Sequence, residues 1–370
     1  MLLIKKFGGT SVGTVERIRK VSEIVTNSFK DGNKIVVVIS AMSNVTDDIY
    51  GKLSDVSAKT RNLREFDQAM ATGEQISASL LSIAIEELGF KSRSYNAFNL
   101  PIYGDGDYSD GHIVQINSQQ LKDDLKNNII PVVTGFQGFK KKDNSFITLG
   151  RGGSDYSAVM VAASMNADLC YIYTDVNGVY TADPRIEKNA IKINELSYDE
   201  TIEIAKDGAK VLQTKSVIAA KKYNISLKVL SSFEENSGTM IANMVMIDRD
   251  KDLKVISCND NLFYCEIDNC LVDDFDFQGK NDFGQNFVLI PKIKKHFYQT
   301  SMIVNDIVKI AVMSLNNSEV LDLSSVKQLL DINNVNFLYC SLDNRKVIIV
   351  LKSKFKVIVI NLLHEFFNSS

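Results

Sequence analysis

Two short, mainly apolar runs with a helical segment between them constrain the fold of the N-terminal part of the chain. The runs Leu2–Phe7 and Ile35–Ile39 are typical of strands buried on both faces of a parallel sheet. Between them, apolar residues recur at helical spacing from Val15 to Val25, and Thr14 is placed to cap the helix. Strand, helix and strand in this order predict a βαβ unit.

The same alternation continues to about Met244. Further helices are predicted at Asp47–Lys59, Asn62–Leu88 and Ser154–Met165, and further strands at Ile129–Thr134 and Leu169–Thr174. Helices alternating with buried strands predict an α/β domain with a parallel-rich central sheet.

The C-terminal part of the chain has a different composition and pattern. Eighteen of the 20 glycines precede residue 245. The pattern after residue 300 predicts strands at Val308–Met313, Val335–Cys340 and Lys346–Leu351 and helices at Ser324–Ile332 and Val357–Phe367. This βαββα order is that of an α+β ferredoxin-like module. We therefore expect one domain over residues 1–244 and a second region over residues 245–370. The second region is expected to contain two modules, at about 245–300 and 301–370, and the pattern of the first of these is weaker.

The overall composition excludes several classes of protein. A length of 370 residues predicts two or three domains, and a net charge of −3 gives no basic excess for nucleic acid or an anionic membrane. Three scattered histidines and five cysteines without CxxC spacing argue against a structural zinc site and favour free thiols in a reducing compartment. The N-terminus lacks the apolar stretch of a signal peptide, and three lysines interrupt the apolar C-terminal segment. We expect a cytoplasmic protein.

The first candidate functional segment is Lys6–Ser11, which follows a predicted strand and precedes a predicted helix. Gly8 and Gly9 allow backbone N–H groups to approach a phosphate, and Lys6 at the strand end can reach a transferred group. It is neither a GxxxxGK[ST] loop nor a GxGxxG fingerprint. A tight β–α turn made for packing explains the hexapeptide equally well.

Two later segments also carry residues suited to ligand binding. In Leu149–Asp155, three glycines surround Arg151, whose guanidinium can bind a carboxylate or phosphate, and a helix follows. In Tyr173–Arg185, an apolar strand ends in Thr-Asp at the edge where α/β sheets bind ligands. Part of this segment, Asn177-Gly178, is also a common turn signal.

Together these segments supply phosphate-binding turns and an arginine without an obvious general base. A carboxylate nucleophile has a pKa near 4 and is already ionised at neutral pH, so it needs no base. Positioning and charge neutralisation then suffice for phosphoryl transfer. The residues alone favour a kinase that acts on a small carboxylate.

Several segments resemble aspartate kinases in uninterrupted order over residues 3–242. They are KFGGTSV at 6–12, TGEQ at 72–75, TLGRGGSDYSA at 148–158, YTDVNGVYTADPR at 173–185, GAKVLQTKSV at 208–217 and SSFEENSGTMI at 231–241. The resemblance implies the amino-acid-kinase fold, a three-layer α/β sandwich. It also implies transfer of the ATP γ-phosphate to the side-chain carboxylate of L-aspartate, the first step toward lysine, threonine and methionine, with Mg²⁺ accompanying ATP.

The resemblance also assigns roles residue by residue. It places the nucleotide at Lys6, Gly8, Gly9, Thr10, Ser11, Thr174, Asp175, Tyr180, Arg185 and Lys210. It places L-aspartate at Ser40, Thr46, Glu74, Phe136, Arg151, Gly152, Gly153 and Ser154. Glu74 would hold the amino group and Arg151 the α-carboxylate. Lys6, Asp155 and Lys210 would be the catalytic residues, and the metal ligands are not assigned.

The C-terminal region departs from the family pattern. Aspartate kinases normally end in two ACT modules, whose first strand leads into a Gly- and Pro-containing turn that binds effector amino acids at a subunit interface. Here the corresponding stretches are Asn316–Glu319 and Asn259–Asn261, without Pro-Gly. We expect an ACT-like scaffold that forms a homodimer or higher homo-oligomer. Feedback inhibition stays open, as do two other functions: a ligand-binding regulatory subunit and a kinase with another acidic substrate.

Overall fold

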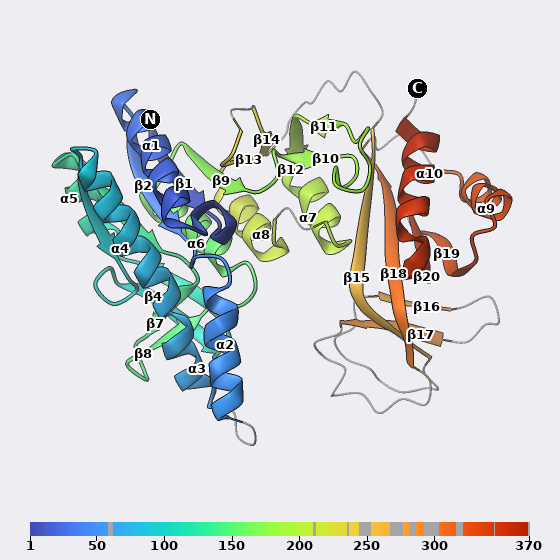
Figure 1. Ribbon diagram of the computed structural model, residues 1–370, viewed down its shortest axis with the longest axis horizontal. Coiled ribbons are helices and arrows are strands. Elements are labelled where there is room, and N and C mark those ends of the chain that lie inside the picture. The colour runs from blue at the N-terminus through green and yellow to red at the C-terminus, as the bar shows by residue number, and fades with distance from the viewer. Residues whose placement is uncertain are drawn as a thin grey trace. The chain divides into compact units, whose positions relative to one another are not determined.

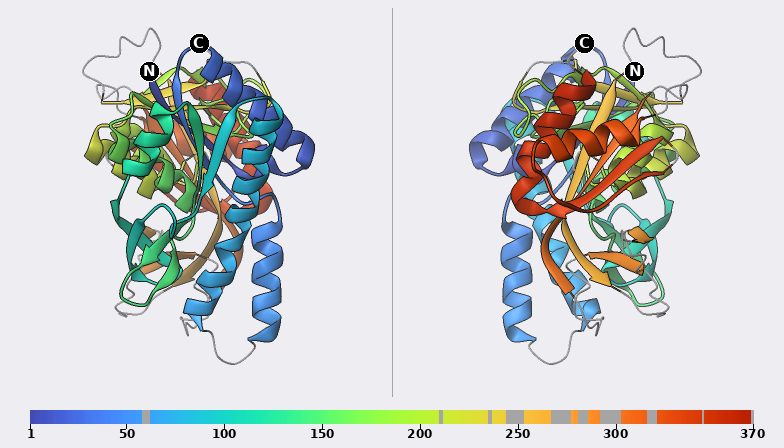
Figure 2. Two further views of the ribbon diagram at one scale, coloured as in Figure 1. Left: turned by 90° about the vertical axis from the view of Figure 1, so that its left-hand side faces the viewer. Right: turned by 90° about the vertical axis from the view of Figure 1, so that its right-hand side faces the viewer.

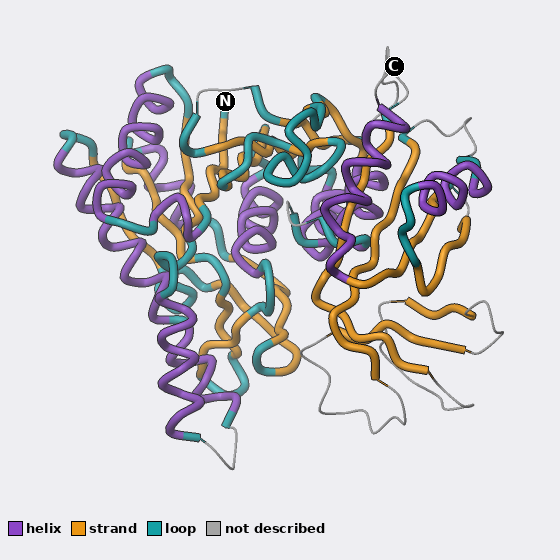
Figure 3. The backbone as a smooth tube through the Cα atoms, turned by 45° about the vertical axis from the view of Figure 1, so that its right-hand side comes forward, coloured by secondary structure: helices purple, strands orange, loops and turns teal. Residues whose placement is uncertain are grey.

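The structure is a computed structural model, and it describes residues 1–57, 62–209, 212–234, 237–243, 253–266, 277–280, 286–291, 303–315, 321–343 and 345–368. The chain forms two compact units (Figures 1 and 3). The first unit comprises Met1–Val179, Asn194–Ile202 and Val211–Val245. The second comprises Tyr180–Ile193, Glu203–Lys210 and Met246–Ser370, so it includes two short segments from the middle of the sequence.

The first unit contains an eight-stranded sheet. Its strands lie in the order β12 (Glu195–Ser197), β14 (Thr239–Ala242), β13 (Leu227–Ser231), β9 (Leu169–Thr174), β1 (Leu2–Phe7), β2 (Lys34–Ile39), β6 (Ile129–Thr134) and β3 (Lys91–Tyr95). All neighbours pair in parallel except β13 and β14. The predicted strands at 129–134 and 169–174 are therefore confirmed, and β1 lies at the centre of the parallel sheet.

Helices cover both faces of this sheet (Figures 1 and 2). On one face, α1 (Val15–Lys30) and α4 (Thr72–Glu87) pack their apolar residues against Phe7 and the inward side chains of β2. On the other face lies α6 (Gly153–Met165), which is buried along nearly its whole length and contacts β1, β2 and β9. The α5 helix (Gln119–Lys126) contacts β2 and β6, and α8 (Thr214–Tyr223) packs on α6. The expected three-layer α/β sandwich is confirmed.

A smaller sheet and a helical pair complete the first unit. The sheet has the order β5 (Asp110–Ile116), β4 (Ile102–Asp107), β7 (Gln137–Lys140) and β8 (Ser145–Thr148). A short 3₁₀ turn, Gly9–Val12, precedes α1, and α2 (Val45–Val56) packs on α3 (Leu63–Met70).

The single helix expected at 62–88 is two helices, α3 and α4, that meet at Ala71. The Ala71 carbonyl accepts a hydrogen bond from the buried Gln137 side chain (2.9 Å), which fixes the junction from outside the helices. In the first turn of α4, Gly73 lies against Ala41, and a Cβ added to this glycine would lie 2.8 Å from the alanine methyl group.

The second unit is an α+β region built on a six-stranded sheet. The strands lie in the order β16 (Phe277–Lys280), β17 (Asn286–Pro291), β15 (Lys254–Glu266), β18 (Ile303–Ser314), β20 (Lys346–Lys352) and β19 (Phe337–Asp343). Helices α9 (Leu323–Ile332) and α10 (Lys356–Asn368), the latter after a 3₁₀ turn at Ser353–Phe355, pack on the sheet through a shared apolar core (Figure 2). From β18 onward the order is the expected βαββα.

The two turns singled out in this region have different outcomes. Asn259–Asn261 lies within the long strand β15, where the register with β18 shifts, so the chain continues as a strand instead of turning back. Asn316–Glu319 lies outside the described residues.

Mid-sequence segments are anchored within the second unit. The Thr181 carbonyl accepts a hydrogen bond from Ile256 N–H (2.7 Å), and its hydroxyl lies 2.9 Å from Nε2 of buried His364 on α10. Strands β10 (Val179–Tyr180) and β11 (Lys192–Ile193) pair around this segment. After α7 (Tyr198–Lys206), buried Asp207 forms ion pairs with Lys346 (2.9 Å) and Lys309 (3.6 Å).

The central strand β1 carries a buried lysine on the face covered by α1 and α4. Lys5 is 5% exposed, and its Nζ lies 3.3 Å from the Tyr173 hydroxyl and over the rings of Tyr171 and Tyr173. Burial lowers the pKa of Lys5 to about 8, an effect that the charge of Asp31 partly opposes. The charged form is therefore costly in the folded state.

We predict that Lys5→Met stabilises the protein at pH 7. Because Lys5 has a lower pKa when folded than when unfolded, its destabilising effect is complete below about pH 8. It is relieved as the pH rises toward 10.5, the ordinary value. The free energy of unfolding in urea should exceed that of the natural protein by up to roughly 3 kcal/mol at pH 7. The difference should shrink between pH 8 and 10; a difference that does not vary with pH would contradict the assignment.

Candidate functional site

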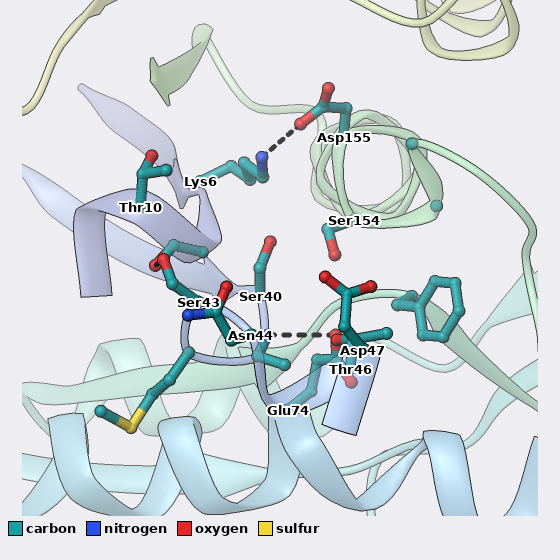
Figure 4. A pocket seen from close by; sticks show the side chains of 16 residues that line it. Lys6, Thr10, Ser40, Ser43, Asn44, Thr46, Asp47, Glu74, Ser154 and Asp155 are labelled. Carbon is teal, nitrogen blue, oxygen red and sulfur yellow. Dashed lines mark hydrogen bonds and ion pairs between the residues drawn. The ribbon is translucent and has the colours of Figure 1, made fainter. Parts of the chain in front are cut away.

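Five parallel strands of the first unit end at the same edge of the sheet. Strands β1, β2, β6, β9 and β13 are mutually parallel neighbours, so the loops that follow Phe7, Ile39, Thr134, Thr174 and Ser231 lie along this edge. This is where α/β sheets bind ligands. A pocket of about 450 Å³ opens there (Figure 4). It is lined by Lys6, Gly9, Thr10, Ser40, Ala41, Met42, Ser43, Asn44, Thr46, Asp47, Glu74, Phe136, Gly152, Gly153, Ser154 and Asp155.

The turn after β1 packs tightly against its neighbours. Gly8 donates its N–H to the Tyr173 carbonyl (3.2 Å), and a Cβ on Gly9 would lie 2.9 Å from the Ala41 carbonyl oxygen. Ser11 is buried and its hydroxyl accepts a hydrogen bond from Ser232 (2.8 Å). Gly9 and Thr10 therefore face the pocket, whereas Gly8 and Ser11 join the turn to β9 and β13.

Lys6 and Asp155 form a buried ion pair at one side of the pocket. Lys6 points from β1 toward the α6 face, and its Nζ lies 2.5 Å from Asp155 Oδ1 in the first turn of that helix (Figure 4). Both residues are less than a tenth exposed. The alternation of side chains along β1 thus separates the pocket lysine from Lys5 on the opposite face.

Glu74 enters the pocket from the first turn of α4 with one oxygen unpartnered. Its Oε1 accepts a hydrogen bond from Ala41 N–H (3.0 Å), while its buried Oε2 has no hydrogen-bond partner among the described residues. Burial raises the pKa of Glu74 to about 7, although the Ala41 bond opposes the shift. A positively charged ligand group would satisfy this oxygen and favour the ionised form.

Two pocket residues other than glycine hold a left-handed backbone conformation. Phe136 has φ +66° and Asn44 has φ +67°, values uncommon outside glycine. Phe136 is held by hydrogen bonds from its N–H to the Ser157 hydroxyl (3.1 Å) and from Leu149 N–H to its carbonyl (2.9 Å). Strained residues held in this way are concentrated at functional sites.

The expected arginine lies at the margin of the site. Arg151 is exposed and does not line the pocket, whereas Gly152, Gly153, Ser154 and Asp155 do. Gly152 has φ +72°, and a Cβ there would approach within 1.9 Å of the Gln213 side chain. The loop therefore requires glycine at this position.

The later residues expected to bind the nucleotide belong to two different units, and one of them lies outside the described residues. Thr174 and Asp175 follow β9 at the same sheet edge, with the Thr174 hydroxyl 3.0 Å from the Asp175 carboxylate. Tyr180 and Arg185 belong to the second unit, where Arg185 forms two hydrogen bonds of 2.9 Å to Asp183. Lys210 lies outside the described residues.

Sequence reasoning missed five pocket residues, Ala41, Met42, Ser43, Asn44 and Asp47. They lie between β2 and the first turn of α2, and the Ser43 hydroxyl donates to the Gly9 carbonyl (3.0 Å). The position of all of them except Asp47 within the SAMSNVT segment, directly after a predicted buried strand, was the available signal.

The described part of the chain contains neither a cluster of metal ligands nor a membrane-spanning helix. There, no group of three or more His, Cys, Asp and Glu side chains is arranged to hold a metal ion by itself. None of the helices in the same residues combines the length and apolar character needed to cross a bilayer.

Curated relatives with similar sequences carry the name aspartokinase. The chain is 41% identical over 271 residues to a protein of that name from Rickettsia bellii, covering 72% of this chain and 66% of the relative. It is 41% identical over 261 residues to one from a Bacillus species, covering 70% and 63%. The matched stretch thus spans slightly less than two thirds of these relatives.

Solved structures show the same fold. The structure of Escherichia coli aspartokinase III in complex with aspartate and ADP superposes with a TM-score of 0.81 at 19% identity, covering 99% of both chains. That of aspartate kinase from Synechocystis superposes with a TM-score of 0.59 at 29% identity, covering all of this chain and 70% of the other. The first of these similarities concerns the fold alone.

A family model described as the amino acid kinase family matches residues 1–231. These residues contain most of the eight-stranded sheet, its two helical layers and all the residues that line the pocket. The chain belongs to the amino acid kinase family.

Proposed function

We propose that this protein is an aspartate kinase, which transfers the γ-phosphoryl group of ATP to the side-chain carboxylate of L-aspartate and forms 4-phospho-L-aspartate and ADP. The single observation that carries the proposal is the charge layout of the pocket: the Lys6 ammonium at one side and the unpartnered oxygen of buried Glu74 at another. An α-amino acid with a second carboxylate complements both. The names of the similar proteins support this choice of substrate.

The described pocket residues account for the chemistry without a general base. The aspartate side chain is ionised at neutral pH, so its oxygen can attack the γ-phosphorus directly. Lys6 neutralises charge on the transferring group, and Asp155, 2.5 Å away, holds the Lys6 side chain in place. Glu74 binds the substrate ammonium, and the hydroxyl groups of Ser40, Thr46 and Ser154 line the same pocket.

The donor is proposed to be ATP with Mg²⁺, bound along the sheet edge between the Gly9–Thr10 turn and Thr174–Asp175. Magnesium usually binds one or two carboxylates together with substrate phosphates and water, and Asp155 is the pocket carboxylate beside the phosphoryl-binding Lys6. When bound, the ion would neutralise phosphate charge. Contacts of Tyr180, Arg185 and Lys210 with the nucleotide, and of Arg151 with the α-carboxylate, stay predictions.

The wider setting is also proposed. The reaction would open the route to lysine, threonine and methionine in the cytoplasm. The six-stranded sheet of the second unit would support a homodimer or higher homo-oligomer, with residues 1–244 as the catalytic domain and 245–370 as the ACT-like region.

Incubation with ATP, Mg²⁺ and L-aspartate should produce an acyl phosphate that hydroxylamine traps as a coloured hydroxamate. L-Glutamate and N-acetylglutamate serve as matched alternative substrates, and omission of ATP serves as the blank. Product from glutamate or acetylglutamate alone would identify a related kinase with another substrate. A folded sample that binds ATP and gives no hydroxamate would instead be a ligand-binding regulatory protein.

Lys6→Met should lower kcat by roughly 10²- to 10³-fold, because the lysine charge matters most as charge develops on the transferring group. Lys5→Met is the matched control, since it removes an adjacent lysine from the opposite face of the same strand. The control should retain nearly full turnover in the hydroxamate assay. Equal kcat in the two variants would remove Lys6 from the mechanism.

Glu74→Gln should stabilise the empty protein while weakening substrate binding. Because the pKa of Glu74 is about 7 when folded and 4.5 ordinarily, the protein loses stability as the pH rises from 4.5 through 7. Glu74→Gln does not lose stability in this way. Its free energy of unfolding should therefore exceed that of the natural protein by roughly 3 kcal/mol at pH 8. Its KM for L-aspartate should rise, because a neutral amide binds the ammonium less strongly. A variant less stable than the natural protein at pH 8 would refute the buried-charge argument.

A further inference from the structure

The loop Leu149–Gly152, hereafter the 149–152 loop, has little structure of its own. It connects β8 to α6, and Gly150 and Gly152 both have left-handed backbone conformations. Its internal support is one turn hydrogen bond, from Gly153 N–H to the Gly150 carbonyl (3.0 Å). The next residues, Ser154 and Asp155, line the pocket. The position of the first turn of α6 therefore depends on the contacts that hold the start of this loop.

A buried carboxylate on α3 holds one flank. Asp67 is 1% exposed and accepts four hydrogen bonds, two at each oxygen. Two come from the N–H (2.7 Å) and hydroxyl (2.9 Å) of Thr148, the last residue of β8. The other two come from the N–H (2.9 Å) and hydroxyl (3.1 Å) of Ser109, in the turn between β4 and β5. The carboxylate is fully satisfied and ties both segments to α3.

A lysine on α8 holds the same two segments from another side. Lys215 Nζ donates to the Leu149 carbonyl (3.2 Å) and to the Gly111 carbonyl (2.7 Å). It also lies 3.6 Å from Asp110 and over the ring of Tyr156 on α6. Leu149 directly follows Thr148, and Gly111 lies two residues after Ser109. One anion and one cation, together with the hydrogen bond from Leu149 N–H to the Phe136 carbonyl (2.9 Å), thus hold the start of the 149–152 loop.

The same contacts join the two walls of the pocket. Asp67 lies on α3, which meets α4 at Ala71 three residues before Glu74. Thr148 is followed by the 149–152 loop and then by Ser154 and Asp155. The Asp67–Thr148 hydrogen bonds therefore fix the helix that carries the ammonium-binding carboxylate relative to the opposite wall.

We propose that Asp67 and Lys215 are positioning residues that fix the 149–152 loop and the first turn of α6 for binding of L-aspartate. The inference rests on the proposed function. Neither side chain lines the pocket, so both act through the loop they hold. Small displacements of a binding wall weaken substrate affinity strongly, because the contacts depend on geometry.

The test compares Asp67→Asn and Lys215→Met with Asp124→Asn in the hydroxamate assay. Asp124 is a matched control because it is also a buried carboxylate, 3% exposed, bound to Arg93 (2.7 Å) and to the Tyr95 hydroxyl (2.5 Å), and it does not line the pocket. KM for L-aspartate and for ATP are measured separately. Thermal melting with and without L-aspartate measures binding independently of turnover.

Asp67→Asn and Lys215→Met should each raise KM for L-aspartate roughly tenfold, the scale of one lost charge-assisted hydrogen bond, with KM for ATP changed less than about twofold. The stabilisation by L-aspartate in the melt should fall in parallel. Asp124→Asn should lower the melting temperature and leave both KM values unchanged.

Folded Asp67→Asn and Lys215→Met variants with an unchanged KM for L-aspartate would overturn the proposal. So would an equal rise in Asp124→Asn, which would indicate general loosening of the domain. If Asp67→Asn does not fold, Thr148→Val removes one hydrogen bond to Asp67 while keeping the backbone N–H, and it should raise the same KM about threefold. A natural protein without hydroxamate activity would contradict the proposed function, whereas an active natural protein with unaffected variants contradicts only the positioning role.

Discussion

The central place of β1 in the sheet is the constraint on which the site depends. With β2 on one side and β9 on the other, both faces of the strand are covered by helices, so each side chain enters one of two buried layers. Two adjacent lysines in such a strand must enter different layers. Lys6 meets Asp155 at the open sheet edge, and Lys5 lies among tyrosines on the far face. One backbone register thereby determines which ammonium can meet a ligand.

Buried charged side chains in the first unit differ in how completely the chain pairs their polar atoms. Asp67 has all its acceptor sites filled by the chain itself, and the Lys6–Asp155 pair is neutralised internally. Glu74 alone of these keeps an oxygen without a partner, beside the pocket. An isolated buried polar atom is costly, so its survival favours a ligand that completes it. Asp67, whose oxygens are all bonded within the chain, shapes the site, whereas Glu74 keeps an oxygen available to bind a ligand.

The sequence predicted strands β1, β2, β6 and β9 because they are continuous or nearly continuous apolar runs, and it predicted the helical segments that became α1, α2, α3, α4 and α6. It did not predict β3, β12, β13, β14, α5, α7 or α8. The strands β4, β5, β7 and β8 were not predicted, since β4, β5 and β7 are interrupted by glycine and polar residues and β8 has only four residues. The lysine and acidic residues of the pocket were identified by their motifs. Asp47 was not, because its place in the lining depends on how the left-handed Asn44 directs the chain into α2. The outward position of Arg151 likewise depends on the glycine conformations around it, which no local pattern encodes.

The packing of the segment Tyr180–Ile193 limits which changes to the C-terminal region the fold can tolerate. Its Thr181 and Ala182 are bonded and packed into the core formed by β15, β18 and α10, although the rest of that core comes much later in the sequence. A chain ending near residue 244 would leave this segment with its apolar and hydrogen-bonding groups uncovered. The strands and helix that cover this segment therefore cannot be deleted as a separate module. Recombination that exchanges C-terminal regions between relatives would have to preserve complementarity to this inserted segment.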